Sequence, residues 1–276
     1  MNNIFLERKL VDTVDTKSEN LHLMRFIAAI MVMISHSYHI STGSETGEWF
    51  RTLTNNQITM GEFAVSIFFL CGGYLIAKSV EKNKTAINYF GARIRRLFPS
   101  LIFVTVITVI FCSFISTWKP VGYVVSWDTW KYLLNGLLIR VHYLPGVFEG
   151  HADAVVNGSL WTLPVEFACY VLCFIAYKLT FLQKKRFPIS IPLVVIGSAI
   201  AWRLGAVRPS LREIISPVLL FYIGIGYWVY REHITLQVKG FVISLVAFVL
   251  LFVLGLGPAA MLLAFPYMMM YLWFGM

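Results

Sequence analysis

The sequence predicts an all-α fold, a polytopic bundle of transmembrane helices, and three observations support this prediction. First, 58% of the 276 residues are hydrophobic. Second, only 13% are charged, which is about half the fraction usual for a soluble domain. Third, the apolar residues gather in long runs. Because so little polar surface cannot cover a water-facing protein, lipid must be the main solvent of this chain.

Eight apolar runs are long enough to cross the hydrocarbon core of a bilayer, which needs roughly 20 helical residues. We therefore expect about eight spans, a short N-terminal tail over residues 1–20 and one membrane domain over residues 21–276. The tail has no apolar core followed by a cleavage site, so the first run should remain as a span. The runs cover residues 21–40, 62–80, 97–117, 160–181, 188–205, 213–230, 239–256 and 258–275.

The net charge of +9 is explained by membrane topology. If the N-terminus is cytoplasmic, sixteen of the 23 lysines and arginines lie on the cytoplasmic side and seven on the other. This is the asymmetry that the positive-inside rule requires. The basic residues therefore predict a cytoplasmic N-terminus and give no reason to expect a nucleic-acid partner.

The four cysteines predict neither a disulfide framework nor a metal site. All of them lie in apolar runs, and none has metal-ligand spacing to a histidine. Buried thiols of this kind commonly behave as small hydrophobic groups. The cysteines are Cys71, Cys112, Cys169 and Cys173.

Two ionisable residues, Arg25 and His36, interrupt the first apolar run. In a helix, two residues eleven positions apart are separated by roughly 20° around the axis and by roughly 16 Å along it. Both side chains therefore project from one face. Such a face should line a bundle interior or a wet cavity, as a functional site would. The alternatives are that Arg25 reaches the interface as an anchor and that His36 makes a structural hydrogen bond. His22 and His39 lie near the same stripe and are expected to be interfacial.

Glu166 is a carboxylate inside the apolar run GSLWTLPVEFACYVLCF. A carboxylate at that depth is costly unless it is paired, protonated or exposed to water. One interpretation is an ion pair with Arg25 or another basic residue that serves packing alone. The other is a group that orients a base or holds a substrate, and the sequence does not separate the two.

Arginines precede the third apolar run in the stretch YFGARIRRLFPSL, where Arg93 and Arg96 share a helix face. Guanidinium groups on one face suit phosphate binding, although an ordinary positive-inside cluster explains the charge as well. In the second run, Gly72 and Gly73 allow a helix or a ligand to approach the backbone closely, and helix packing is the expected reason.

Taken in order, these stretches resemble the acyltransferase-3 family of bacterial membrane acyltransferases. The resemblance covers residues 21–170 and rests on four matches. They are Arg25 and His36 with ten residues between them, Cys71-Gly72 where the family usually has Ser-Gly, Arg93 and Arg96 before Pro99, and a Trp–Glu–Tyr motif formed by Trp161, Glu166 and Tyr170.

The resemblance implies an O-acyltransferase of the bacterial cytoplasmic (inner) membrane. It would move an acyl group, usually acetyl, from acyl-CoA to a hydroxyl of a sugar or a lipid-linked glycan, with no metal. Its partners would be the bilayer, acyl-CoA and the glycan. The implied catalytic residues are His36 and Glu166, and the implied substrate-binding residues are Arg25, Arg93, Arg96 and Trp161. Family members commonly have about ten spans of roughly 20 residues each, so either a truncated or a short member is expected here.

Two mechanisms and a second function are compatible with these residues. His36 could act as a general base on the acceptor hydroxyl, or it could carry the acyl group as an acyl-histidine. A transporter or flippase could use the same ionisable residues as a substrate or proton path. Transporters often contain internal repeats, and this sequence has none that we can detect.

Overall fold

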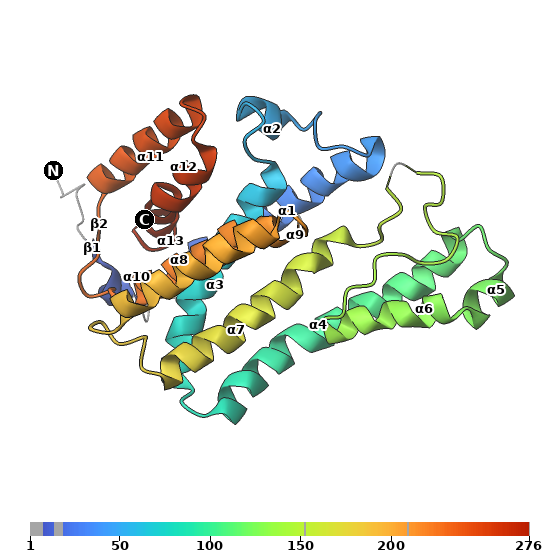
Figure 1. The fold of residues 1–276 in the computed structure, drawn as a ribbon, viewed down its shortest axis with the longest axis horizontal. Coiled ribbons are helices and arrows are strands. Elements are labelled where there is room, and N and C mark those ends of the chain that lie inside the picture. The colour runs from blue at the N-terminus through green and yellow to red at the C-terminus, as the bar shows by residue number, and fades with distance from the viewer. Residues whose placement is uncertain (1–7, 14–18, 152, 209, 276) are drawn as a thin grey trace. The chain divides into compact units, whose positions relative to one another are not determined.

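The computed structural model describes residues 8–13, 19–151, 153–208 and 210–275, and helices dominate them (Figure 1). The predicted all-α fold class is therefore confirmed. The longer helices are α1 (Glu19–Thr42), α3 (Met60–Lys82), α4 (Ala86–Ile115), α7 (Thr162–Lys178), α8 (Phe187–Leu204), α10 (Ile215–Val229), α11 (Val238–Val253) and α13 (Phe265–Phe274). The shorter elements are α2 (Trp49–Leu53), α5 (Pro120–Val125), α6 (Trp127–Lys131), α9 (Ser210–Glu213), α12 (Gly257–Leu263), the 3-10 helices η1 (Leu10–Thr13), η2 (Tyr132–Leu137) and η3 (Gly158–Trp161), and the strands β1 (Arg8–Lys9) and β2 (Thr235–Leu236).

Among the described residues, six helices are long and apolar enough to cross a membrane, or seven if one bent pair counts as a span. The count of about eight spans is therefore approximate. The bent pair is α12 and α13, which meet at an angle of 43°. Pro266 stands in the first turn of α13, where its missing N–H and its ring favour a break before it. The remaining predicted span contains α11, which has only 16 residues and is followed by Gly255 with φ of +78°.

The chain divides into two compact units. Unit 1 lies within Met1–Ser35, Thr46–Glu81 and Cys169–Met276, and unit 2 lies within His36–Glu45 and Lys82–Ala168. Two helices, α1 and α7, begin in one unit and end in the other. The sequence pattern, which predicted one membrane domain over residues 21–276, contains no sign of this division.

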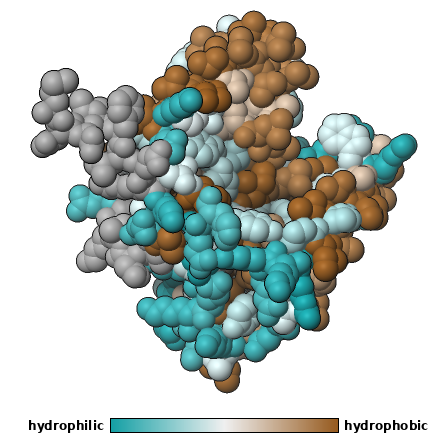
Figure 2. Space-filling view, turned by 90° about the vertical axis from the view of Figure 1, so that its left-hand side faces the viewer, coloured by the Kyte–Doolittle hydropathy of each residue, from teal (hydrophilic) through white to brown (hydrophobic). Residues whose placement is uncertain are grey.

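On the face shown in Figure 2, apolar side chains (brown) are exposed over a large area beside polar ones (teal). On α8, Ile189, Leu193, Ile196 and Ile200 are all exposed. Exposed apolar surface on this scale marks a membrane protein, because water would not tolerate it and lipid does.

Part of the predicted N-terminal tail has structure of its own. Strand β1 pairs antiparallel with β2, so that Arg8 lies opposite Leu236 and Lys9 opposite Thr235. Leu10 and Leu236 are fully buried beside this pairing. A pairing of two residues on each strand is too short to leave a periodic signal in the sequence.

In unit 1, α3 and α10 pack backbone against backbone. A Cβ atom built on Gly73 would overlap the carbonyl oxygen of Phe221, and one built on Gly224 would overlap the carbonyl oxygen of Leu70. The close approach expected at Gly72-Gly73 thus occurs at Gly73. A Cβ atom built on Gly72 would lie 3.5 Å from the Phe221 ring, which is an ordinary contact. Small residues permit such contacts between membrane helices, where dispersion forces rather than water drive association.

In unit 2, the segment after α4 folds back onto the end of that helix. The Tyr123 hydroxyl donates to the Val109 carbonyl at 2.9 Å. The Asn135 amide donates to the Tyr132 and Val141 carbonyls at 2.9 and 2.8 Å, so the irregular backbone has internal partners. A buried cluster holds the segment together, formed by Val109, Cys112, Tyr123, Tyr132, Leu144, Val147 and Val156.

The glycine contact predicts a specific loss of stability. We expect Gly73→Val to cost about 1–3 kcal/mol, because the new side chain can be accommodated only if α3 and α10 separate. The measurement is the midpoint of thermal unfolding of the purified protein in detergent. Gly197→Val on α8 is the matched control, since no atom lies within 4 Å of its Cβ position. Equal midpoints for the two variants would contradict the packing role of Gly73.

Candidate functional site

His36 lies in unit 2 beside a histidine–carboxylate pair. One helical turn after His36, the Nε2 atom of His39 is 2.9 Å from Oδ2 of Asp153. His36 interacts electrostatically with both partners of this pair. Asp153 is held in place, because its Oδ1 atom also accepts a hydrogen bond from the backbone N–H of Val155 at 3.0 Å. His36, His39 and the Asp153 carboxylate are therefore close enough to interact near the end of α1.

The pair contributes little to stability. The side chain of His39 is 39% exposed and that of Asp153 is 20% exposed. Partly exposed ion pairs are typically worth about 0–1 kcal/mol. The arrangement is therefore better suited to orienting groups and placing charge near His36 than to holding the fold together.

The residues from Asp153 to Gly158, which we call the connecting segment, are fixed by hydrogen bonds. Tyr132 donates its hydroxyl to the Val156 carbonyl at 3.2 Å. The Asn157 amide donates to the Thr108 hydroxyl on α4 at 2.9 Å and to the Tyr132 hydroxyl oxygen at 3.2 Å. Burial raises the pKa of Tyr132 to about 12, so this hydroxyl stays protonated and remains a donor at physiological pH.

The connecting segment ends beside His36. A Cβ atom built on Gly158 would lie 3.9 Å from Cε1 of the His36 ring. Gly158 begins η3, which ends at Trp161 and leads directly into α7. The connecting segment therefore begins with Asp153, the partner of His39, and ends with Gly158, the neighbour of His36.

Glu166 lies in the first half of α7 and is half-buried. The ring of the next residue, Phe167, contacts Phe90 and Phe98 on α4 with centroid distances of 6.5 and 6.1 Å. Those two residues flank Arg93 in the sequence. The first half of α7 is thus packed against the part of α4 that contains the arginines.

The two arginines of α4 have different surroundings. Arg93 is buried, and its guanidinium carbon lies 5.4 Å from the centroid of the Tyr89 ring. Arg96 is exposed. Arg25 is half-buried and lies in the part of α1 that belongs to unit 1. The predicted residues Trp161 and Glu166 share unit 2 with His36, Arg93 and Arg96.

Two residues near His36, His39 and Asp153, are not among the predicted site residues. His39 was expected to be interfacial, although its spacing of three residues from His36 placed it near the same face. Asp153 lies in irregular backbone, where no periodicity indicates which residues meet. Only the folded chain brings it to His39.

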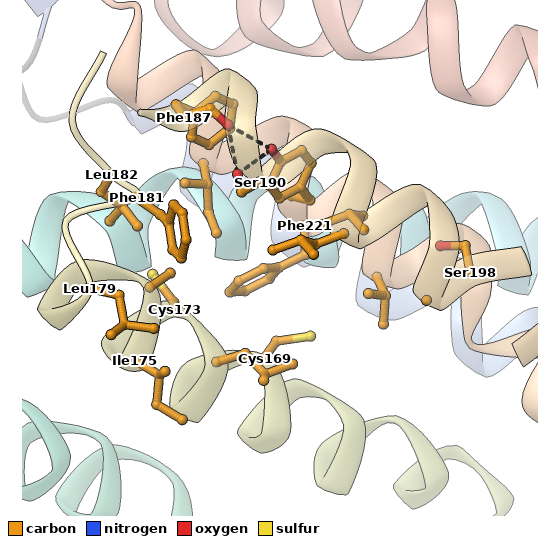
Figure 3. Close-up of a pocket in the computed structure, with 18 of the residues that line it drawn as sticks. Cys169, Cys173, Ile175, Leu179, Phe181, Leu182, Phe187, Ser190, Ser198 and Phe221 are labelled. Carbon is orange, nitrogen blue, oxygen red and sulfur yellow. Dashed lines mark hydrogen bonds between the residues drawn. The ribbon is translucent and has the colours of Figure 1, made fainter. Parts of the chain in front are cut away.

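A large apolar cavity of about 430 Å³ lies in unit 1 between α7, α8 and α10 (Figure 3). Its walls include Cys169 and Cys173 from α7 and Phe221 from α10. The hydroxyls of Ser190 and Tyr222 bond each other there at 2.7 Å. Among the described residues that line it, there is no histidine, carboxylate or basic side chain and no predicted site residue.

Among residues 8–13, 19–151, 153–208 and 210–275, no group of three or more histidine, cysteine, aspartate or glutamate side chains could hold a metal ion. The four cysteines are all buried.

Comparison with known proteins extends the resemblance noted in the sequence. The family described as an acyltransferase domain matches residues 18–276. The O-acetyl transferase of Shigella phage Sf6 is 29% identical over 237 residues, covering 84% of this chain and 68% of that protein. Nodulation protein 10 of Rhizobium leguminosarum bv. viciae is 25% identical over 221 residues, covering 76% of this chain and 57% of that protein.

A third relative, acyltransferase MdmB of Streptomyces mycarofaciens, is 28% identical over 159 residues, which are 56% of this chain and 38% of that protein. The chain thus matches between 38% and 68% of the length of these relatives. No solved structure matches it. The family match extends over nearly the whole chain, and the protein therefore belongs to the acyltransferase-3 family of multi-pass membrane O-acyltransferases.

Proposed function

We propose that this protein transfers an acetyl group from acetyl-CoA to a hydroxyl of a sugar or lipid-linked glycan in the bacterial inner membrane. The similarity to a phage protein named O-acetyl transferase supports the choice of acetyl. The observation that carries the proposal is the position of His36, which lies in a membrane-spanning helix and interacts with the His39–Asp153 pair. An ionisable ring with such partners inside a span is typical of a functional site.

His36 is the general base of the proposed reaction. Its neutral imidazole takes the proton of the acceptor hydroxyl, and the hydroxyl oxygen attacks the thioester carbonyl carbon. The carbon–sulfur bond then breaks, and the leaving thiolate takes the proton from His36 to form free coenzyme A. The Asp153 carboxylate, held by His39 and by the backbone of Val155, favours the positive charge that develops on His36.

Arg93 and Arg96 bind the donor in this proposal. The phosphates of coenzyme A are anionic, and exposed Arg96 presents a guanidinium that can bind a phosphate with two parallel hydrogen bonds. Arg93 is buried beside Tyr89 and lies deeper along the path of the donor. Trp161 and Glu166, which share unit 2 with His36, extend the proposed site along η3 and α7. Arg25 remains a predicted substrate-binding residue.

The general-base role predicts that His36→Ala and His36→Asn abolish transfer and leave the protein abundant in the membrane. General-base catalysis contributes typically about 10²- to 10⁴-fold, so the loss should be at least about 100-fold. The assay follows labelled acetyl-CoA with purified protein in lipid and a series of glycan acceptors. His22→Ala, an exposed histidine on the same helix, is the matched control.

If folded His36 variants transferred the acetyl group at the wild-type rate, His36 would not be the general base. Donor consumption that depends on a sugar hydroxyl supports the enzyme. Glycan transport across the vesicle membrane, without donor consumption, would instead identify a transporter.

The histidine–carboxylate pair predicts a rate effect without a stability effect. Asp153→Asn keeps the shape of the side chain and removes its charge, and we expect kcat to fall about tenfold, the equivalent of about 1.4 kcal/mol. The KM for acetyl-CoA and the thermal midpoint should not change, because a partly exposed pair contributes about 0–1 kcal/mol. Glu232→Gln, which removes the exposed carboxylate paired with Lys184, is the control. A drop in midpoint that matches the loss of rate would indicate a structural role for Asp153 instead.

The donor site predicts that Arg96→Ala raises the KM for acetyl-CoA by more than about tenfold, because a hydrogen bond to a charged group is worth about 1.5–3 kcal/mol. Adding Arg93→Ala should increase the effect. Arg95→Ala is the matched control, since Arg95 is exposed on the same helix. Equal KM values for the Arg95 and Arg96 variants would assign these arginines to membrane topology alone.

A further inference from the structure

A second cavity of about 430 Å³ lies in unit 2, in the segment between α4 and η3. Its size falls within the range of roughly 300–1,000 Å³ that is common for small-molecule sites. In contrast to the apolar cavity of unit 1, its walls combine two aromatic rings with three charged groups. These are Trp118, Tyr143, Asp128, Lys131 and Glu149.

The cavity is built on fixed backbone. Glu149 accepts a hydrogen bond from the Gly146 backbone N–H at 3.0 Å and one from the Thr117 hydroxyl at 3.4 Å. Gly146 has φ of +68°, and a Cβ atom there would lie only 2.6 Å from the Trp118 ring. The ring therefore sits directly against this glycine. Leu144, which also lines the cavity, is 3% exposed and belongs to the buried cluster of unit 2.

The wall chemistry fits a neutral sugar ring. A pyranose has C–H faces that pack on aromatic rings and hydroxyls that both donate and accept hydrogen bonds. Trp118 and Tyr143 are 44% and 61% exposed, so each ring has a free part to offer a ligand. The carboxylates of Asp128 and Glu149 accept from hydroxyls, and the Lys131 ammonium donates to them.

Other ligand classes fit the cavity less well. Two carboxylates against one ammonium disfavour the phosphates of an acyl donor. A lipid chain needs no charged wall, and burying three charges against it would be costly. A tryptophan that only anchors the protein at the membrane interface should resemble Trp127, which is 74% exposed and does not line the cavity.

The cavity is linked to His36 by the connecting segment. Ala154 forms part of the cavity wall, and the residue before it, Asp153, holds His39. Four residues after Ala154, Gly158 lies beside the His36 ring. A ligand in the cavity therefore contacts the same short segment that borders the proposed base.

We propose that this cavity binds a neutral pyranose unit of the acceptor glycan and so presents a hydroxyl of that glycan to the site of transfer. The proposal rests on the proposed function, because it names the binding site for the acceptor of that reaction. It assigns recognition of the glycan to Trp118, Tyr143, Asp128 and Lys131.

The test measures sugar binding without any reaction. Saturation-transfer difference NMR is recorded on the protein in lipid nanodiscs with the methyl glycosides of glucose, galactose and mannose. We expect at least one glycoside to bind, and Trp118→Ala to weaken binding about 2- to 10-fold, as the loss of one stacked ring predicts. Lys131→Ala should weaken it as well, and Trp127→Ala is the matched control. The proposal is overturned if none of the three binds, or if the Trp118 and Trp127 variants bind equally well.

A transfer assay separates this proposal from the proposed function. If a glycoside binds in a Trp118-dependent way and the wild-type protein transfers no acetyl group, the cavity is confirmed as a sugar site and the proposed function fails. If transfer occurs and Trp118→Ala leaves the KM for the glycan unchanged, the proposed function stands and the cavity is not the acceptor site.

Discussion

A membrane-spanning helix tolerates an ionisable side chain only where the protein itself supplies partners for it, since hydrocarbon offers none. That constraint organises the site proposed for this protein. His36 stands near the end of the first span, and its partners come from one turn along the same helix and from an irregular segment far away in the sequence. Partly exposed pairs such as His39–Asp153 typically contribute about 0–1 kcal/mol to stability, and this pair also interacts electrostatically with His36.

The irregular segment of unit 2 is as important to this site as the helices are. Side chains supply partners for its irregular backbone: Asn135 donates to the Tyr132 and Val141 carbonyls, and Tyr132 donates to the Val156 carbonyl. Its apolar residues form a buried cluster against the end of α4. This packing fixes the connecting segment, with Asp153 beside His39 and Gly158 beside His36. The same segment lines the cavity of unit 2 that contains Asp128, Lys131 and Glu149.

Unit 1 is held together in a different way. Its helices meet through close backbone contacts at Gly73 and Gly224, and its cavity between α7, α8 and α10 has almost wholly apolar walls. Apart from hydroxyls and thiols, the groups that could carry acid–base chemistry do not line that cavity. The proposed site residues His36, Arg93 and Glu166 belong to unit 2 and are not among the described residues that line this cavity.

The sequence by itself determined the membrane class, the approximate positions of the spans and the placement of Arg25 and His36 on one helix. These properties depend on local composition and on the 3.6-residue period of the helix, so they can be predicted without knowledge of the tertiary contacts. The sequence predicted one span over residues 258–275, and only the structure shows the 43° break between α12 and α13, just before Pro266. The tertiary structure alone decided the pairing of β1 with β2, the contact of Asp153 with His39 and the cavity of unit 2. Each of these joins residues that are distant in the sequence through irregular or very short elements, and no periodic pattern records such contacts.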